Sequence, residues 1–203
     1  MFFQSATFKG PLTCAVSLAF IAAGHAQPLP RPMPACTSPG QIIGLTLNTG
    51  TGLLSPPPGR FDPIWRIVPT ADIFSTTRVS SWVPAPPGSR WVQRSIVGNP
   101  VSFPPAPWFN PVVYITRFTA QPANYQSITI NGFYSGDNTA NFKLNGIPIG
   151  SCFSGTCFTA LHPITPPNSS QFGPLNVVTV EVTNASFSPS ALLVRAAVTA
   201  KCL

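Results

Sequence analysis

The sequence predicts an all-β protein, a two-sheet antiparallel β-sandwich with proline-rich loops and disulfide bridges. Three observations support this prediction: short segments in which apolar and polar residues alternate, clusters of proline and glycine between them, and four cysteines downstream of residue 26. Alternation with a period of two is what a strand with one buried face produces. Many short strands without helical periodicity are typical of a sandwich or a barrel.

The alternation is clearest in residues 177–183, where Thr179, Glu181 and Thr183 separate valines that are expected to face the core. The pair Asn145-Gly146 predicts a two-residue hairpin turn, because both residues tolerate the positive φ of a type I′ turn. Strands are expected at residues 41–47, 62–68, 78–83, 90–97, 112–120, 127–133, 141–144, 177–183 and 192–200.

The first 26 residues are expected to be a secretory signal peptide. Lys9 supplies positive charge, residues 12–23 are apolar, and Gly24-His25-Ala26 is a small-x-small cleavage motif. The apolar stretch is too short to span ~30 Å of hydrocarbon, so no membrane span is expected. Residues 27–40 are expected to form an extended, proline-rich leader and residues 41–203 one β-sandwich domain. The expected location is secreted or extracellular, including the cell surface.

The four cysteines of residues 27–203 are expected to form two disulfides, because an even count in an oxidising compartment implies bridges. Three pairings are open. Cys152–Cys157 is favoured because four residues between them make a tight loop, and Cys36–Cys202 because it would tie the two ends of the domain together. The rival is a zinc site. A single His162 and no paired C-x-x-C spacing argue against it, so no metal is expected.

Charge is scarce in this chain: 7% of residues are charged, against about 25% in ordinary soluble proteins. The formal net charge is +7, and the arginines are scattered singly. A nucleic-acid-binding protein gathers Lys and Arg on one face, because affinity grows with the number of phosphates neutralised together. No nucleic-acid partner is therefore expected. The arginines are expected to be solvated or locally paired. The alternative is that some of them converge on an anion, for which acidic polysaccharide is the favoured candidate outside the cell.

Few side chains are suited to acid–base catalysis. Residues 27–203 contain only Asp62, Asp72, Asp137, Glu181 and His162 of the usual kinds. Glycoside hydrolysis usually needs two carboxylates about 5 to 10 Å apart, and no G-x-S-x-G motif accompanies any serine. We therefore expect no catalytic residues and no enzyme activity.

Aromatic residues are the best candidates for ligand contact. Trp65 and Trp91 lie within expected strands and are expected in the core. Trp108 and Phe109 lie between prolines in an expected loop, where their rings suit the apolar faces of sugars. A plug at the end of the sandwich is the alternative for Trp108. Tyr134 is included among the candidate ligand-binding residues.

Asp137 and Asn138 are the polar candidates. Their side chains could bind sugar hydroxyls, or Ca²⁺ together with backbone carbonyls, although no cofactor is indicated. The alternative is a turn in which both side chains bond their own backbone.

Several segments of the second half fit one known pattern. They are Tyr114-Ile115-Thr116-Arg117-Phe118, Gly136-Asp137-Asn138 and residues 144–150 and 173–184. Together they resemble the galactose-binding-like, jelly-roll domains of bacterial exported proteins, similar to the sugar-binding domains of glycoside hydrolases. The resemblance implies a jelly-roll sandwich with a carbohydrate-binding or adhesive role. The chain departs from the pattern at residues 152–157 and in the proline-rich stretch 99–111.

These observations predict a secreted, non-catalytic carbohydrate-binding or adhesive module whose partner is an extracellular polysaccharide or a cell-surface glycan. The alternative is a structural subunit of an extracellular filament, sheath or surface layer. Self-association would then use an edge strand such as residues 41–47, because an open edge can pair with a strand of a neighbour.

Overall fold

The computed structural model describes residues 29–50, 61–68, 71–76, 78–93, 102–103, 111–184 and 188–203. The expected signal peptide lies outside these residues. The strands are β1 (Arg31–Pro32), β2 (Ile42–Thr46), β3 (Phe61–Val68), β4 (Ala71–Ser75), β5 (Val92–Gln93), β6 (Ser102–Phe103), β7 (Val112–Thr119), β8 (Tyr125–Gly136), β9 (Thr139–Leu144), β10 (Ile147–Cys152), β11 (His162–Pro163), β12 (Leu175–Thr183), β13 (Ser188–Pro189) and β14 (Leu192–Cys202). The only helices in the described ranges are single 3₁₀ turns, η1 (Pro122–Asn124), η2 (Cys157–Thr159) and η3 (Ser169–Gln171).

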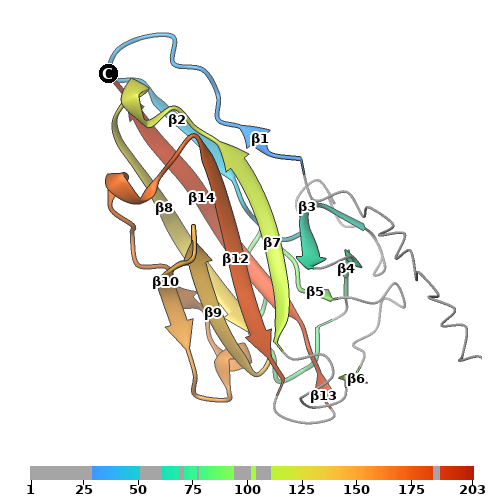
Figure 1. The fold of residues 1–203 in the computed structure, drawn as a ribbon. Helices are drawn as coiled ribbons and strands as arrows, with labels where there is room; N and C mark the ends of the chain where they lie inside the picture. The colour runs from blue at the N-terminus through green and yellow to red at the C-terminus, as the bar shows by residue number, and fades with distance from the viewer. Residues whose placement is uncertain are drawn as a thin grey trace, which may run out of the picture.

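The strands form a two-layer sandwich, as predicted. Hydrogen-bonded neighbours run in the order β10-β9-β12-β7-β3-β4-β5-β14-β8-β11, with β1 added to β7 and β2 added to β14. We call β10, β9, β12, β7 and β3 the front layer, and β2, β14, β8 and β11 the back layer; Figure 1 shows β12 and β7 in front of β14. The step from β4 to β5 joins the layers along one side. All described pairings except β1 with β7 are antiparallel.

Alternation along the central strands builds the core. In β12, Val178, Val180 and Val182 are fully buried, whereas Thr179 and Glu181 are partly exposed on the outer face. Val194 and Val198 of β14 belong to the same buried cluster. Trp65, expected in the core, is buried there, and its Nε1 donates a hydrogen bond to the carbonyl oxygen of Leu47 at 2.8 Å.

The predicted hairpin is confirmed. Asn145 and Gly146 have φ of 50° and 83°, and they connect β9 to β10 with Leu144 opposite Ile147. The predicted strands at 41–47, 62–68, 112–120, 127–133, 141–144, 177–183 and 192–200 are also confirmed as β2, β3, β7, β8, β9, β12 and β14.

The strand predicted at residues 78–83 is wrong. The segment is a turn in which the Trp82 N–H bonds the Val79 carbonyl at 3.0 Å and Arg78 Nη1 donates to the Trp82 carbonyl at 2.7 Å. Its apolar residues pack against Ala191 and Leu193 rather than joining a ladder. The strand predicted at residues 90–97 is reduced to β5, and residues 94–97 lie outside the described part.

Two disulfides hold the domain, with the pairing that the spacing favours. Cys36–Cys202 joins the leader to the end of β14, 166 residues later, and Cys152–Cys157 closes the short loop after β10. Residues 29–37 of the leader contain no helix or turn and run alongside β7 as β1, whereas residues 38–40 form a turn before β2. Arg31 Nη2 donates a hydrogen bond to the Thr46 carbonyl at 2.6 Å, so the leader contacts both layers.

Candidate functional site

Trp108 and Phe109, the predicted aromatic contact residues, lie outside the described residues. The structure therefore gives them no position.

Tyr134 is a core residue and not a surface contact. Its side chain is 1% exposed, and its ring centroid lies 5.5 Å from that of Phe142 and 5.9 Å from that of His162. Burial raises the pKa of the Tyr134 hydroxyl to about 12. The prediction that Tyr134 contacts a ligand is corrected, because the side chain that faces inward at this position of β8 is enclosed between the layers.

Asp137 is a buried structural carboxylate. It is 4% exposed, and its Oδ2 accepts a hydrogen bond from Trp82 Nε1 at 2.9 Å. Trp82 in turn packs on Trp91, with ring centroids 4.5 Å apart. Burial raises the pKa of the Asp137 carboxyl to about 6. The prediction that Asp137 is an open binding residue is corrected. The alternative, a turn, holds for the backbone, since residues 137 and 138 form the bend between β8 and β9, but the carboxylate bonds Trp82 and not its own backbone, and so anchors residues 78–91 to the end of β8.

Asn138 continues this anchor through its main chain. Its N–H bonds the Thr183 carbonyl at 2.9 Å, and its carbonyl accepts the Cys157 N–H at 3.0 Å. The Asp137 carbonyl accepts a hydrogen bond from Ser190 Oγ at 3.3 Å. The backbone oxygens that could have joined a Ca²⁺ site are therefore bonded to the protein's own donors.

Cys152, Cys157 and His162 lie close enough together to resemble a metal site, with candidate ligand atoms within 4.8 Å of one another. The two sulfurs are joined in a disulfide, so neither is a thiolate that could bind zinc. His162 Nε2 lies 3.2 Å from the Cys157 carbonyl oxygen. We interpret these three residues as a structural element that holds the loop between β10 and β11 in place.

Three carboxylates have side chains that the structure describes, Asp62, Asp137 and Glu181, and each accepts a hydrogen bond or forms an ion pair within the fold. Asp62 is buried and accepts hydrogen bonds from the N–H groups of Gly50, Ile64 and Trp65. Glu181, on the outer face of the front layer, forms an ion pair with Lys143 at 2.6 Å. With Asp137 buried as well, these three carboxylates leave little negative charge on the described surface.

The best candidate site is a shallow groove of about 600 Å³ on the outer face of the back layer. Its polar and aromatic lining consists of Thr46, Asn48, Asn131, Phe133 and Arg195, contributed by β2, β8, β14 and the residues after β2. Phe133 is 45% exposed and lies directly opposite Arg195 in the β8–β14 ladder. We call these residues the back groove.

Two features shape the floor of the back groove. Gly132 has φ of 145°, and a Cβ there would collide with the carbonyl oxygen of Arg195 and lie 2.5 Å from the Cα of Ala196. Only glycine allows β8 and β14 to approach so closely here. Asn48 fixes the other side, since its Nδ2 donates to the Gly88 carbonyl at 3.0 Å and its Oδ1 accepts the Ala196 N–H at 2.9 Å.

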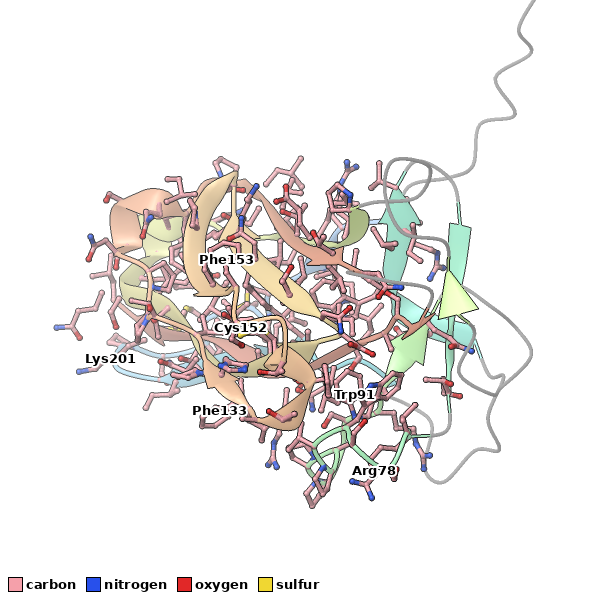
Figure 2. All side chains as sticks on the ribbon, turned by 90° about the horizontal axis from the view of Figure 1, so that it is seen from below. Arg78, Trp91, Phe133, Cys152, Phe153 and Lys201 are labelled. Atoms are coloured by element: carbon pink, nitrogen blue, oxygen red, sulfur yellow. A yellow bond between two sulfur atoms is a disulfide. The ribbon has the colours of Figure 1, made fainter. Side chains whose placement is uncertain are left out.

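The charge on this face is positive. The exposed side chains of Arg195 and Asn131 make no hydrogen bond or ion pair with any described residue, so both are available to a ligand. Lys201 follows on the same face of β14, about 20 Å along the strand from Arg195 at ~3.3 Å per residue. Figure 2 shows Lys201, Phe133 and Arg78 along one side of the molecule, away from Phe153.

A second hollow, of about 380 Å³, lies between the leader and the β7–β8 connection. Its lining includes three prolines, Met33, Tyr125 and two amide side chains, and the amides are bonded to each other, with Asn124 Nδ2 donating to Gln121 Oε1 at 2.8 Å. It contains no charged side chain. The back groove offers more unpaired polar groups and is the better candidate.

Sequence reasoning did not single out Phe133 or Arg195. Both fall inside correctly predicted strands, and a large aromatic residue on the outward-facing side of β8 was the available signal. Their neighbourhood depends on the pairing of β8 with β14, which brings together residues 62 positions apart.

Fold and site together define a disulfide-bridged β-sandwich with a cationic, aromatic groove on one outer face. No family model and no curated protein matches the sequence. Nothing helical in the described ranges has the length and hydrophobicity that a transmembrane span requires.

Proposed function

We propose that this protein is a secreted, non-catalytic module that binds carbohydrate through the back groove, and that the ligand is an acidic polysaccharide or cell-surface glycan. The observation that carries the proposal is the pairing of an exposed aromatic ring, Phe133, with the unpaired guanidinium of Arg195. The ring suits the apolar face of a sugar, and the guanidinium can donate two hydrogen bonds to a carboxylate or sulfate.

The shape of the site favours a polymer over a small molecule. Enclosed pockets cover most of a small ligand, whereas this groove is shallow and open along the strands. Lys201 lies further along the same face, so an extended anionic chain could contact both cations. The resemblance of residues 114–184 to galactose-binding-like domains agrees with this proposal, and the disulfides suit an oxidising extracellular compartment.

The proposal of a non-catalytic role rests on the described carboxylates. Asp62 and Asp137 are buried and hydrogen-bonded, and Glu181 lies on the opposite face of the sandwich in an ion pair. None of these three carboxylates lines the back groove. Hydrolysis of a glycoside by a pair of carboxylates would therefore lack its acid and base at the proposed site.

The test is binding of a uronic-acid polysaccharide, with a neutral polysaccharide for comparison, measured by calorimetry. Arg195→Gln should weaken binding about tenfold, because a hydrogen bond to a charged group contributes about 1.5 kcal/mol. Phe133→Ala should weaken it about fivefold through loss of ring stacking. Raising NaCl from 0.1 M to 1 M should also weaken binding, because the Debye length falls from about 10 Å to about 3 Å.

Two matched controls lie elsewhere. Arg117→Gln removes a cation from the front layer, and Phe153→Ala removes an exposed ring from the loop after β10. Both should leave binding unchanged. Equal loss of affinity in the control and groove variants, or equal binding of the neutral polymer at all salt concentrations, would refute the proposal.

A structural subunit of an extracellular filament, sheath or surface layer is the second candidate function. The observation that favours it is the open edge of β2, developed below.

A further inference from the structure

The edge of β2 that faces away from β14 pairs with no other strand within the described residues. Within residues 41–47, the main-chain groups of the odd-numbered residues form the hydrogen bonds to β14. The Leu47 N–H donates to the Ala196 carbonyl, and the Gln41 carbonyl accepts the Cys202 N–H, each at 2.8 Å. Because main-chain groups alternate in direction along a strand, the N–H and C=O groups of Ile42 and Gly44 point away from β14. Both residues are exposed.

Three other edge strands in the described part of the chain carry features that block strand pairing. β10, at the end of the front layer, contains Pro148 and a register irregularity, and the two-residue strands β1 and β11 contain Pro32 and Pro163. Proline, charge and bulges are the usual means of blocking edge-to-edge association. The five residues of β2, Ile-Ile-Gly-Leu-Thr, include none of them.

We infer that two copies of this chain pair antiparallel through β2, with Ile42 of each copy opposite Gly44 of the other. This register satisfies the outward groups of both residues with four hydrogen bonds across the contact. The paired stretch is expected to end before Thr46, because Arg31 Nη2 already donates a hydrogen bond to the Thr46 carbonyl.

The side chains of β2 are compatible with a second copy of the chain at this edge. Ile42 is 74% exposed on the outer face, and in this register it lies beside a residue without a side chain. The contact is self-complementary, as a two-fold interface requires, and β2 brings no charged side chain to it.

Pairing at β2 would join the two back layers into one sheet. The two-fold axis of an antiparallel strand pair is perpendicular to the sheet, so both outer faces lie on the same side. The inference does not depend on glycan binding, but a dimer of this kind would present two back grooves to one surface and bind a polymer with higher avidity.

Sedimentation equilibrium over a range of protein concentrations tests this inference, together with amide hydrogen exchange. The wild-type protein should shift from monomer to dimer as concentration rises, and the Ile42 and Gly44 amides should exchange more slowly at the higher concentrations. Gly44→Pro removes an outward donor and leaves the β14 ladder intact. A Cβ at this position would meet its nearest neighbour, the Val198 carbonyl oxygen, at an ordinary 3.5 Å. This variant should associate at least tenfold more weakly.

Ile42→Lys is a second variant, which introduces charge at the contact and does not alter the main chain; it should also associate at least tenfold more weakly. Phe153→Lys is the control, since Phe153 is 71% exposed and lies outside β2; it should dimerise like wild type. A protein that stays monomeric at all concentrations, or an Ile42→Lys protein that dimerises like wild type, would overturn the inference. Loss of dimers with normal polysaccharide binding would separate this contact from the proposed function.

Discussion

Replacing Asp137 with Asn should remove a pH-dependent part of the stability of this protein. The Asp137 carboxyl is buried beside Trp82, and burial raises its pKa to about 6, from an ordinary value of 3.8. A carboxyl with a higher pKa in the folded state binds its proton more readily there than in the unfolded chain. The contribution of Asp137 to stability therefore increases as pH falls from about 7 to about 4, and it is lost again as pH rises through 6.

The size of the effect follows from the two pKa values. Proton linkage between 3.8 and about 6 gives a contribution of at most about 2 kcal/mol between pH 7.5 and pH 4.5. Asn is neutral at both pH values, so Asp137→Asn should lack this contribution. Its side-chain oxygen can still accept the hydrogen bond from Trp82 Nε1, which keeps the anchor of residues 78–91 in place.

Urea unfolding at both pH values, followed by tryptophan fluorescence with the disulfides intact, measures this difference. The gain in unfolding free energy on going from pH 7.5 to pH 4.5 should be larger in the wild type than in Asp137→Asn. Burial also raises the pKa of Asp62, but that contribution is common to both proteins and cancels. If the two proteins show the same pH dependence, Asp137 is not desolvated in the way that its burial implies.

Two further perturbations test the fold itself. Replacing Cys36 and Cys202 with Ala should cost up to about 5 kcal/mol of unfolding free energy, because the bridge closes a loop with a sequence separation of 166, whereas the same change at Cys152 and Cys157 should cost about 2 kcal/mol. Urea titrations of the two double variants give the order, and an equal loss would contradict the loop-entropy argument. Gly132→Ala should lower the unfolding free energy by about 3 kcal/mol, because residue 132 has φ of 145° and the new methyl group would collide with the backbone of β14. A thermal melt that matches wild type would contradict the close approach of β8 and β14.

The parts of the fold that could be predicted from sequence depend on neighbours along the chain. The valines of β12 alternate with Thr179 and Glu181 because one face of the strand is buried, and that pattern is visible without a partner strand. The Asn145-Gly146 turn is similar, since the conformational freedom of two adjacent residues decides it. The cysteine pairing followed from spacing and from the advantage of tying together the two ends of the domain.

The parts that could not be predicted depend on residues far apart in sequence. Residues 78–83 look like a strand because they contain apolar residues that require burial. In the structure these residues are buried by packing against Ala191 and Leu193 and not by joining a sheet. Asp137 follows Ser-Gly and precedes Asn, as a turn residue would, yet its hydrogen-bond partner Trp82 lies 55 positions earlier. The back groove likewise requires the register of β8 with β14, which places Phe133 opposite Arg195.

The distribution of charge connects the fold to both proposals. A carboxylate in the interior is tolerated only where donors meet it, and Asp62 and Asp137 have backbone N–H groups and an indole N–H as partners. Placing those carboxylates inside leaves the cations on the surface without neutralising neighbours on the back layer. Arg195 and Lys201 then give this face a field that attracts anions, while β2 beside them has no charged side chain and open main-chain groups. The scarcity of exposed acidic residues thus favours an anionic ligand on the face of the back layer, whereas strand pairing at its edge depends on the uncharged residues and main-chain groups of β2.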